Sequence, residues 1–262
     1  MQKSSLPRRI TSARSWLGLA SVLAGLLLWW IVARTANLPA FILPSPGDVG
    51  RRFLSAATDG SLLLHTGVTL LEVLLGLLFG VGLATILGYL VAKSHALERV
   101  LSPYLVASQA VPLVAIAPLL VIWFGPGMFS KVLICALIVF FPVLVNTVVG
   151  VRAVPGPLYD LMRSLHAGQT QVLLHLEIPA ALPIFLGGLR IGATLSVIGA
   201  VVGELVGSDQ GLGFLINVGR GQYDTALVFV AVFVLIALAL CLYGAVAWLE
   251  TRALGWQEWR QV

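Results

Sequence analysis

DLMRSLHAGQTQVLLHLEIPAALP, from Asp160 to Pro183, is the longest polar interval in a chain that otherwise consists mainly of long apolar runs. Of the 262 residues, 59% are hydrophobic and 10% are charged, and the mean hydropathy is +1.00. This hydropathy is far above that of a soluble domain of the same length. The sequence therefore predicts an integral membrane protein, in which this polar loop lies in water on one side of the membrane.

Six apolar runs meet or approach the length of a membrane span. A bilayer core about 30 Å thick requires roughly 20 apolar residues per helix. The runs are continuous rather than alternating, which favours helices over the strands of a barrel. We expect spans near 16–33, 69–92, 101–124, 132–151, 183–206 and 226–249. The predicted fold class is an all-α membrane protein with six transmembrane helices.

The basic residues are distributed unequally between the two sides of the membrane. With six spans both termini share a side, and ten of the 16 Lys and Arg residues fall on it, against five on the other side and Arg190 within a span. The positive-inside rule makes the shared side cytoplasmic, together with the loop at 152–182. Basic residues next to anionic lipid explain the net charge of +5, so we expect membrane lipid and no nucleic acid as partners.

A short helix is expected on the outer side, after the letters LPSP that follow the first span. Ser45 is suited to the N-cap, Pro46 to the first helical position and Asp48 to the first turn. Val49 and Phe53 would form one apolar face. This pattern is typical of a connector that lies on the membrane surface.

Among the polar residues within the predicted spans, two carboxylates and two amides are costly to place in lipid and suggest function. We take them as pathway candidates: Glu72, Gln109, Asn146 and Glu204. For the two amides, hydrogen bonding between helices is an equally open interpretation. The two carboxylates are expected near the outer ends of their spans, where their charge would repel an anionic solute. No group of His or Cys residues has metal or redox spacing, so we expect no metal and no cofactor.

Prolines and glycines predict the geometry of two spans. Pro112 and Pro118 are expected to kink the third span. In the second span, the glycines, among them the pair Gly76 and Gly80, are expected to let a neighbouring helix approach closely.

The polar loop itself has helical periodicity. The apolar residues Leu158, Leu161, Met162 and Leu165 recur at the spacing of one helix face. A second helical piece is expected over Gln169 to Leu176, after which Pro179 and Pro183 would break and restart the backbone. Such an amphipathic helix either lies along the membrane or docks into a groove on a partner protein.

The spacing within this loop resembles E-A-A-x(3)-G-x(9)-I-x-L-P, the cytoplasmic signature of permease subunits of binding-protein-dependent ABC importers. Asp160 corresponds to the acid, Leu161 and Met162 to the two small residues, and Leu176, Ile178 and Pro179 to the end of the motif. His166 replaces the glycine, and Gly168 is an alternative source of flexible backbone at the turn.

The resemblance extends from Leu43 to Leu249. Further stretches that are similar to the nitrate, sulfonate, taurine and vitamin-precursor branch of the family are LPSP, QAVPLVAIAPLLVIWFG at 109–125, FFPVLVNTVVGVR at 140–152 and ELVGSDQGLGFLI at 204–216. LRIGATLSVIGAVVGELVG at 189–207 and Glu72 look closer to permeases for riboflavin or thiamine-pyrimidine precursors. A sulfonate, taurine or nitrate remains the alternative substrate.

The resemblance implies a type I ABC importer permease core in which a cytoplasmic coupling helix contacts an ATPase. The implied partners are two ABC ATPase subunits, an extracytoplasmic substrate-binding protein and a second copy of the permease. No G-x-x-x-x-G-K-[ST] sequence is present, so ATP hydrolysis belongs to a partner and the chain is not expected to be an enzyme. The residues implied in coupling are Asp160, Leu161, Met162, Leu165, His166, Leu176, Ile178 and Pro179.

These expectations divide the chain into five parts: a cytoplasmic tail at 1–15, a retained first anchor at 16–33, an outer connector at 34–61, a permease core at 62–249 and a cytoplasmic tail at 250–262. An ion-coupled secondary transporter is the rival class. It should show an internal repeat with broken helices in matching halves, and the sequence shows no such symmetry.

Overall fold

Every regular element in the described part of the chain is helical, as the all-α class requires. The computed structural model describes residues 9–36, 38–110 and 112–255, and side chains from residue 20 onward apart from 106 and 108–110. The helices are α1 (Arg9–Thr35), α2 (Pro46–Thr58), α3 (Ser61–Lys93), α4 (His95–Ala110), α5 (Leu113–Phe124), α6 (Met128–Arg152), α7 (Gly156–Ser164), α8 (Gln169–Val172), a π-helical turn (Leu173–Glu177), α9 (Ile178–Gly207), α10 (Leu212–Gly221) and α11 (Thr225–Ala253). The predicted tails at 1–15 and 250–262 fall partly outside the described residues.

Four helices are long and apolar enough to cross a membrane. They are α3, α6, the continuous helix Gln169–Gly207 that contains α9, and α11. Two shorter apolar helices, Ala20–Thr35 within α1 and Leu113–Phe124, correspond to the first and third predicted spans. The third predicted span is not one kinked helix, because α4 ends at Ala110 and α5 begins after Pro112. Proline lacks the N–H that would continue the helix, and it disfavours helical backbone in the residue before it.

Helix α6 occupies the centre of the bundle, between α3 and α9. A Cβ atom added at Gly80 of α3 would lie 2.7 Å from the carbonyl oxygen of Ala136 in α6, and one added at Gly188 of α9 would lie 2.6 Å from the Cβ of Asn146. Gly76 and Gly88 approach α6 in the same way. The small residues therefore let both backbones approach α6 closely, as the sequence predicted for the second span.

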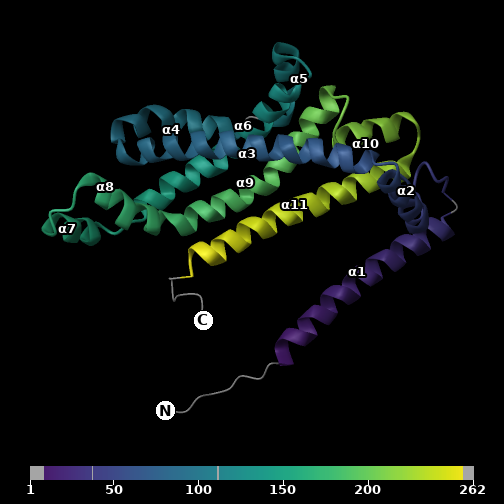
Figure 1. Cartoon of the computed structure of the whole chain (residues 1–262), viewed down its shortest axis with the longest axis horizontal. Helices are drawn as coiled ribbons and strands as arrows, with labels where there is room; N and C mark the ends of the chain where they lie inside the picture. The colour runs from purple at the N-terminus through teal and green to yellow at the C-terminus, as the bar shows by residue number, and fades with distance from the viewer. Residues whose placement is uncertain (1–8, 37, 111, 256–262) are drawn as a thin grey trace.

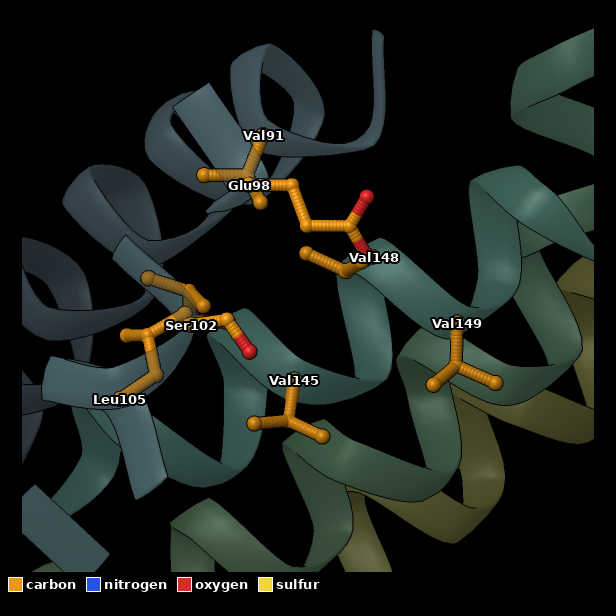
Figure 2. Close-up of a pocket in the computed structure, with 8 residues that line it drawn as sticks. Val91, Glu98, Ser102, Leu105, Val145, Val148 and Val149 are labelled. Atoms are coloured by element: carbon orange, nitrogen blue, oxygen red, sulfur yellow. The ribbon is translucent and has the colours of Figure 1, made fainter. Parts of the chain in front are cut away.

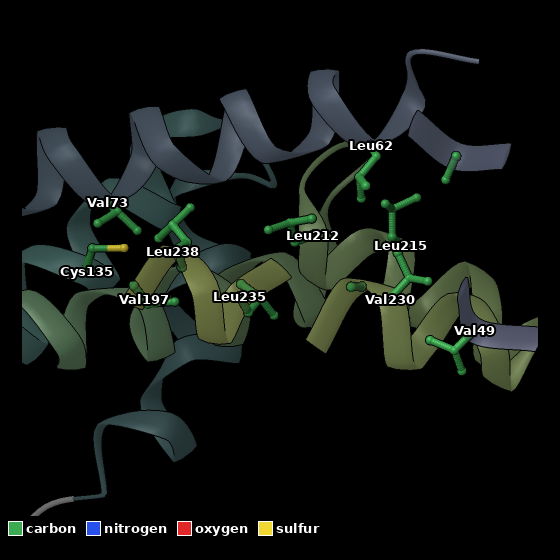
Figure 3. Packing of buried hydrophobic residues seen from close by; sticks show 13 residues of the cluster. Val49, Leu62, Val73, Cys135, Val197, Leu212, Leu215, Val230, Leu235 and Leu238 are labelled. Carbon is green, nitrogen blue, oxygen red and sulfur yellow. The ribbon is translucent and has the colours of Figure 1, made fainter. Parts of the chain in front are cut away.

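A larger apolar core lies where α9, α10 and α11 meet α2 and α3. Its buried members include Val49, Leu212, Leu215, Val230 and Leu235 (Figure 3). This cluster joins the short helices α2 and α10 to the long apolar helices. It thereby fixes where the start of α10 lies relative to α3 and α9.

The LPSP segment begins α2 as the sequence predicts. The Ser45 hydroxyl accepts a hydrogen bond from the backbone N–H of Asp48, and the Asp48 carboxylate accepts one from the backbone N–H of Ser45, which completes a capping box. Val49 is buried, but Phe53 is 42% exposed, so the predicted apolar face is only half covered within this chain.

The two ends of the bundle carry different short helices (Figure 1). Helices α7 and α8 lie at one end, towards which α11 also ends, whereas α2 and α10 lie at the opposite end. Helix α1 contacts α2 at its C-terminal end and diverges from the bundle towards its N-terminal end. Trp29 holds its last turns against α11 by stacking on Phe229, with ring centroids 5.3 Å apart.

Candidate functional site

Helix α7 is the predicted coupling helix, and its apolar stripe is uncovered. No residue of α7 is buried, and Leu161 and Leu165 are 54% and 68% exposed. Asp160 is exposed on the same helix, with its carboxylate 3.7 Å from Arg163. The described chain thus presents a short amphipathic helix at one end of the bundle with most of its apolar stripe exposed.

His166 makes the turn that follows α7. Its φ is +53°, in the left-handed region that favours glycine. The Ala167 N–H bonds to the Met162 carbonyl at 3.0 Å and the His166 N–H to the Arg163 carbonyl at 2.9 Å, which is the Schellman pattern. Gly168 has a φ of −71°, which any residue can adopt, so the left-handed residue of this turn is not Gly168. Histidine adopts the glycine conformation itself.

The return from the loop into the membrane is continuous. We expected Pro179 and Pro183 to break the backbone, and this expectation is wrong, because one helix runs from Gln169 to Gly207. The π-helical turn Leu173–Glu177 ends two residues before Pro179. Its wider ladder of hydrogen bonds accommodates the missing N–H and the bulky ring of the proline. Leu176 of the motif is buried, whereas Ile178 is 45% exposed.

At the opposite end, Glu72 and Glu204 are fully buried in a polar cluster. Lys131 donates to Glu72 Oε1 at 2.9 Å and to the Ser208 hydroxyl at 2.7 Å. Lys131 is itself 4% exposed. The cluster therefore pairs an ammonium on α6 with a carboxylate on α3 inside the bundle.

Glu204 caps the start of α10. Its Oε2 accepts from the Gly213 N–H at 2.5 Å, and its Oε1 accepts from the Thr69 hydroxyl at 2.6 Å. Thr69 in turn accepts from the Leu212 N–H at 2.8 Å. A carboxylate at a helix N-terminus satisfies free N–H groups and is favoured by the helix dipole. Gly211, with a φ of +109°, has no Cβ to collide with this carboxylate.

The two amide candidates, Gln109 and Asn146, lie on α4 and α6. Asn146 Nδ2 donates to the Pro142 carbonyl of its own helix at 2.8 Å, and its side chain rests on Gly188 of α9. The interpretation left open for this amide was hydrogen bonding between helices; its hydrogen bond is instead made within α6, and only its packing on Gly188 joins it to α9. Gln109 lies in α4, and its side chain is outside the described part of the structure.

A cavity of about 220 Å³ lies between α4 and α6 near the α7 end of the bundle (Figure 2). Val145, Val148 and Val149 of α6 line it, with Glu98 and Ser102 of α4 as its polar groups. The Glu98 carboxylate forms an ion pair with Arg152 of α6. That guanidinium holds the pKa of Glu98 below its usual range. The carboxylate therefore already has a partner within the chain.

Comparison with known proteins places this arrangement in a family. Residues 80–255 match the model for the binding-protein-dependent transport system inner membrane component. The chain belongs to this family of ABC transporter permeases. It is a multi-pass subunit of the inner membrane, and it is a transport protein rather than an enzyme. The family implies ATPase and substrate-binding partners for this permease.

Several relatives share most of the permease's length. It is 46% identical over 242 residues to the riboflavin transport system permease protein of Chloroflexus aurantiacus, covering 92% of this chain and 90% of the relative. It is 36% identical to the formylaminopyrimidine transport permease protein of Halalkalibacterium halodurans, with coverages of 89% and 92%. It is 33% identical to the taurine transport system permease protein of Escherichia coli, with coverages of 90% and 86%.

Solved structures agree at the level of the fold. A chain of a methionine ABC transporter in inward-facing conformations has a TM-score of 0.63 at 17% identity, covering 72% of the permease and 94% of that chain. A chain of an amino acid ABC transporter has a TM-score of 0.61 at 20% identity, with coverages of 76% and 98%. The permease therefore has the fold of ABC importer permeases.

Sequence reasoning missed the polar partners of the charged residues. Lys131 and His65 had been given no role inside the bundle, yet Lys131 pairs with Glu72, and His65 Nδ1 accepts from the Gly211 N–H at 3.0 Å. Glu177 stood at a variable position of the motif, yet it is a buried hub of hydrogen bonds. An acid flanked by the apolar residues Leu176 and Ile178 was the available signal for Glu177.

Proposed function

We propose that this permease forms the solute pathway of an ATP-driven importer, as a homodimer with two ATPase subunits on the cytoplasmic side and a substrate-binding protein outside. The observation that carries the proposal is the uncovered apolar stripe of α7 at one end of the bundle, within the family's cytoplasmic motif. A stripe of this kind fits a groove on a partner protein.

The proposed topology has six spans and cytoplasmic termini. The four long apolar helices supply four spans, and α1 and the α4–α5 pair supply the other two. The positions of α7 and α2 at opposite ends of the bundle support this arrangement (Figure 1). The core then extends over 62–249, with an outer connector at 34–61 that includes α2.

The proposed coupling residues divide into three roles. Leu161, Met162 and Leu165 contact the ATPase, and Asp160 lies beside them on α7. His166 turns the chain back towards the membrane. The last three, Leu176, Ile178 and Pro179, connect the loop to α9. Closure of the ATPase pair would displace α7 and so switch the permease between outward and inward states.

The proposed substrate is a vitamin-type heterocycle, riboflavin or a thiamine pyrimidine precursor. The relative at 46% identity supports riboflavin, and the one at 36% supports the pyrimidine precursor. Taurine or another sulfonate is the second candidate, since a taurine permease is 33% identical. The repulsion of anions by Glu72 and Glu204 no longer contributes, because both carboxylates are buried.

The pathway candidates remain predictions. Glu72 and Glu204 would meet a solute only in a conformation in which Lys131 and the start of α10 move away from them. Asn146 would meet a solute only if its side chain moved away from Gly188.

Transport in reconstituted vesicles tests the proposal. The permease is assembled with its ATPase and binding protein, and uptake of labelled riboflavin, formylaminopyrimidine and taurine is compared with and without ATP. We expect ATP-dependent uptake of one heterocycle in preference to taurine. Preferred uptake of taurine would overturn the substrate, and uptake driven by an ion gradient without the ATPase would overturn the mechanism.

A pair of variants on α7 tests the docking. Leu161→Asp places a charge on the apolar stripe, and Ser164→Asp places the same charge off the stripe on the same helix. We expect Leu161→Asp to reduce copurification of the ATPase and ATP-driven uptake by about tenfold or more, the scale of losing a buried apolar anchor at an interface. Equal effects of the two variants would contradict docking through the stripe.

A further inference from the structure

Glu177 joins three elements at the point where the coupling loop enters the membrane. The side chain is 1% exposed and ends the π-helical turn before α9. Its Oε1 accepts from the Tyr159 hydroxyl of α7 at 3.1 Å, and its Oε2 accepts from the Tyr89 hydroxyl of α3 at 3.0 Å. Lys93, the last residue of α3, forms an ion pair with the same carboxylate.

Tyr89, Tyr159 and Lys93 together give both oxygens of the Glu177 carboxylate a partner. The Lys93 ammonium also lies over the rings of Tyr89 and Tyr159, at 5.7 and 5.5 Å from their centroids. Burial raises the pKa of Tyr159 to about 12, with a further contribution from the hydrogen bond to Glu177. The Tyr159 hydroxyl is therefore a neutral donor throughout the physiological range. Hydrogen bonds to a buried carboxylate are charge-assisted and stronger than neutral ones.

Little else in the described chain connects α7 to the membrane helices. No α7 residue is buried, and among the described side chains of α7 it is Tyr159 that hydrogen-bonds to another helix. A cavity of about 430 Å³ lies beside the cluster, lined by Ile86 of α3, Val151 of α6 and Phe185 of α9. Side chains thus leave space between these helices there, and the Glu177 cluster bridges α3, α7 and α9 beside it.

We propose that Glu177 is a positioning residue that makes α3 and the start of α9 follow α7 when α7 is displaced. This inference rests on the proposed docking of α7 to an ATPase. Without the carboxylate, α7 would move while α3 and α9 lag behind. ATP hydrolysis would continue, and fewer solute molecules would be moved per ATP.

The first experiment compares uptake with hydrolysis in the full reconstituted complex. The variants are Glu177→Gln and Tyr159→Phe, with Glu98→Gln as the matched control. Glu98 also forms an ion pair at the α7 end of the bundle, but its partner Arg152 lies on α6 and not on α7. We expect Glu177→Gln to lower uptake per ATP by about tenfold, the scale of losing charge-assisted hydrogen bonds. Tyr159→Phe should lower it less, and Glu98→Gln should stay near the original ratio.

Restoring an opposite charge separates positioning from folding. The exchange of Lys93→Glu together with Glu177→Lys should recover part of the ratio that either single change loses. No recovery in an assembled complex, or an unchanged ratio in Glu177→Gln, would overturn the proposal. An equal loss in Glu98→Gln would do the same.

A second experiment does not depend on transport. Spin labels at Ser164→Cys on α7 and Leu83→Cys on α3, in a background of Cys135→Ala and Cys241→Ser, report the distance between the two helices in the purified permease. We expect one narrow distance distribution, which broadens in Glu177→Gln and not in Glu98→Gln. An unbroadened distribution overturns the link even if ATP-driven uptake is seen. Absence of ATP-driven uptake with clear broadening overturns the proposed function and leaves the link standing.

Discussion

Lys131 holds its positive charge inside the bundle, between Glu72 and Ser208. An ammonium in this position costs desolvation free energy, which the carboxylate and the hydroxyl offset. Removing one member of a buried ion pair leaves the other charge without compensation. The stability of this end of the bundle should therefore depend strongly on this one lysine.

We predict that Lys131→Met lowers the free energy of unfolding by about 3–5 kcal/mol, because Glu72 would remain buried without its cation. Thermal unfolding of the purified permease in detergent measures the effect. Arg51→Met is the control, since Arg51 is exposed and its pair with Asp48 should contribute under about 1 kcal/mol. Adding Glu72→Gln to Lys131→Met should recover part of the loss, and an unchanged unfolding temperature in Lys131→Met would contradict the prediction.

His166 offers a test of backbone strain. A left-handed conformation costs a residue other than glycine roughly 1–2 kcal/mol. We predict that His166→Gly preserves ATP-driven uptake and stabilises the turn after α7 by about 1 kcal/mol. His166→Val should destabilise it, because a β-branched side chain tolerates this conformation poorly. Hydrogen exchange at the Ala167 amide reports the turn, and slower exchange in the valine variant than in the glycine variant would refute this account.

At the scale of elements, the packing of α3 on α6 depends on which face of α3 a glycine occupies. Gly80 meets the Ala136 backbone, whereas nothing lies within 4 Å of a Cβ at Gly82. We predict that Gly80→Leu forces the helices apart, at a cost of about 1–3 kcal/mol or more, and lowers the yield of folded permease. Gly82→Leu should be tolerated. Similar yields and unfolding temperatures for both variants would contradict the packing described for α3.

The elements also show what the sequence could and could not predict. Apolar length located most spans, and cap chemistry located the start of α2, because both are local properties. Pairings such as Lys131 with Glu72 depend on which helices are neighbours, which one sequence does not contain. The continuous helix through Pro179 escaped prediction for a different reason: a π-helical turn has no periodicity of its own to detect in a sequence.

At the scale of the whole molecule, the two ends of the bundle should face different compartments. We predict that Ser164→Cys on α7 reacts with a membrane-impermeant maleimide only from the cytoplasmic side, and Arg51→Cys on α2 only from outside. Both changes are made in a background of Cys135→Ala and Cys241→Ser. Labelling of right-side-out and inverted vesicles distinguishes the sides. Reaction of both positions from the same side would overturn the six-span topology.

The π-helical turn at Leu173–Glu177 also affects how α7 is oriented around the axis of α9. It holds one residue more than an α-helical turn, and one residue corresponds to a rotation of about 100° around a helix axis. Loss of a single residue from this turn would therefore return it to an ordinary α-helical turn and leave the direction of α7 around α9 nearly unchanged. The same one-residue deletion in the regular α-helical part of α9 would instead rotate α7 by about a quarter of a turn around the axis of α9, although every residue of the docking helix would still be present.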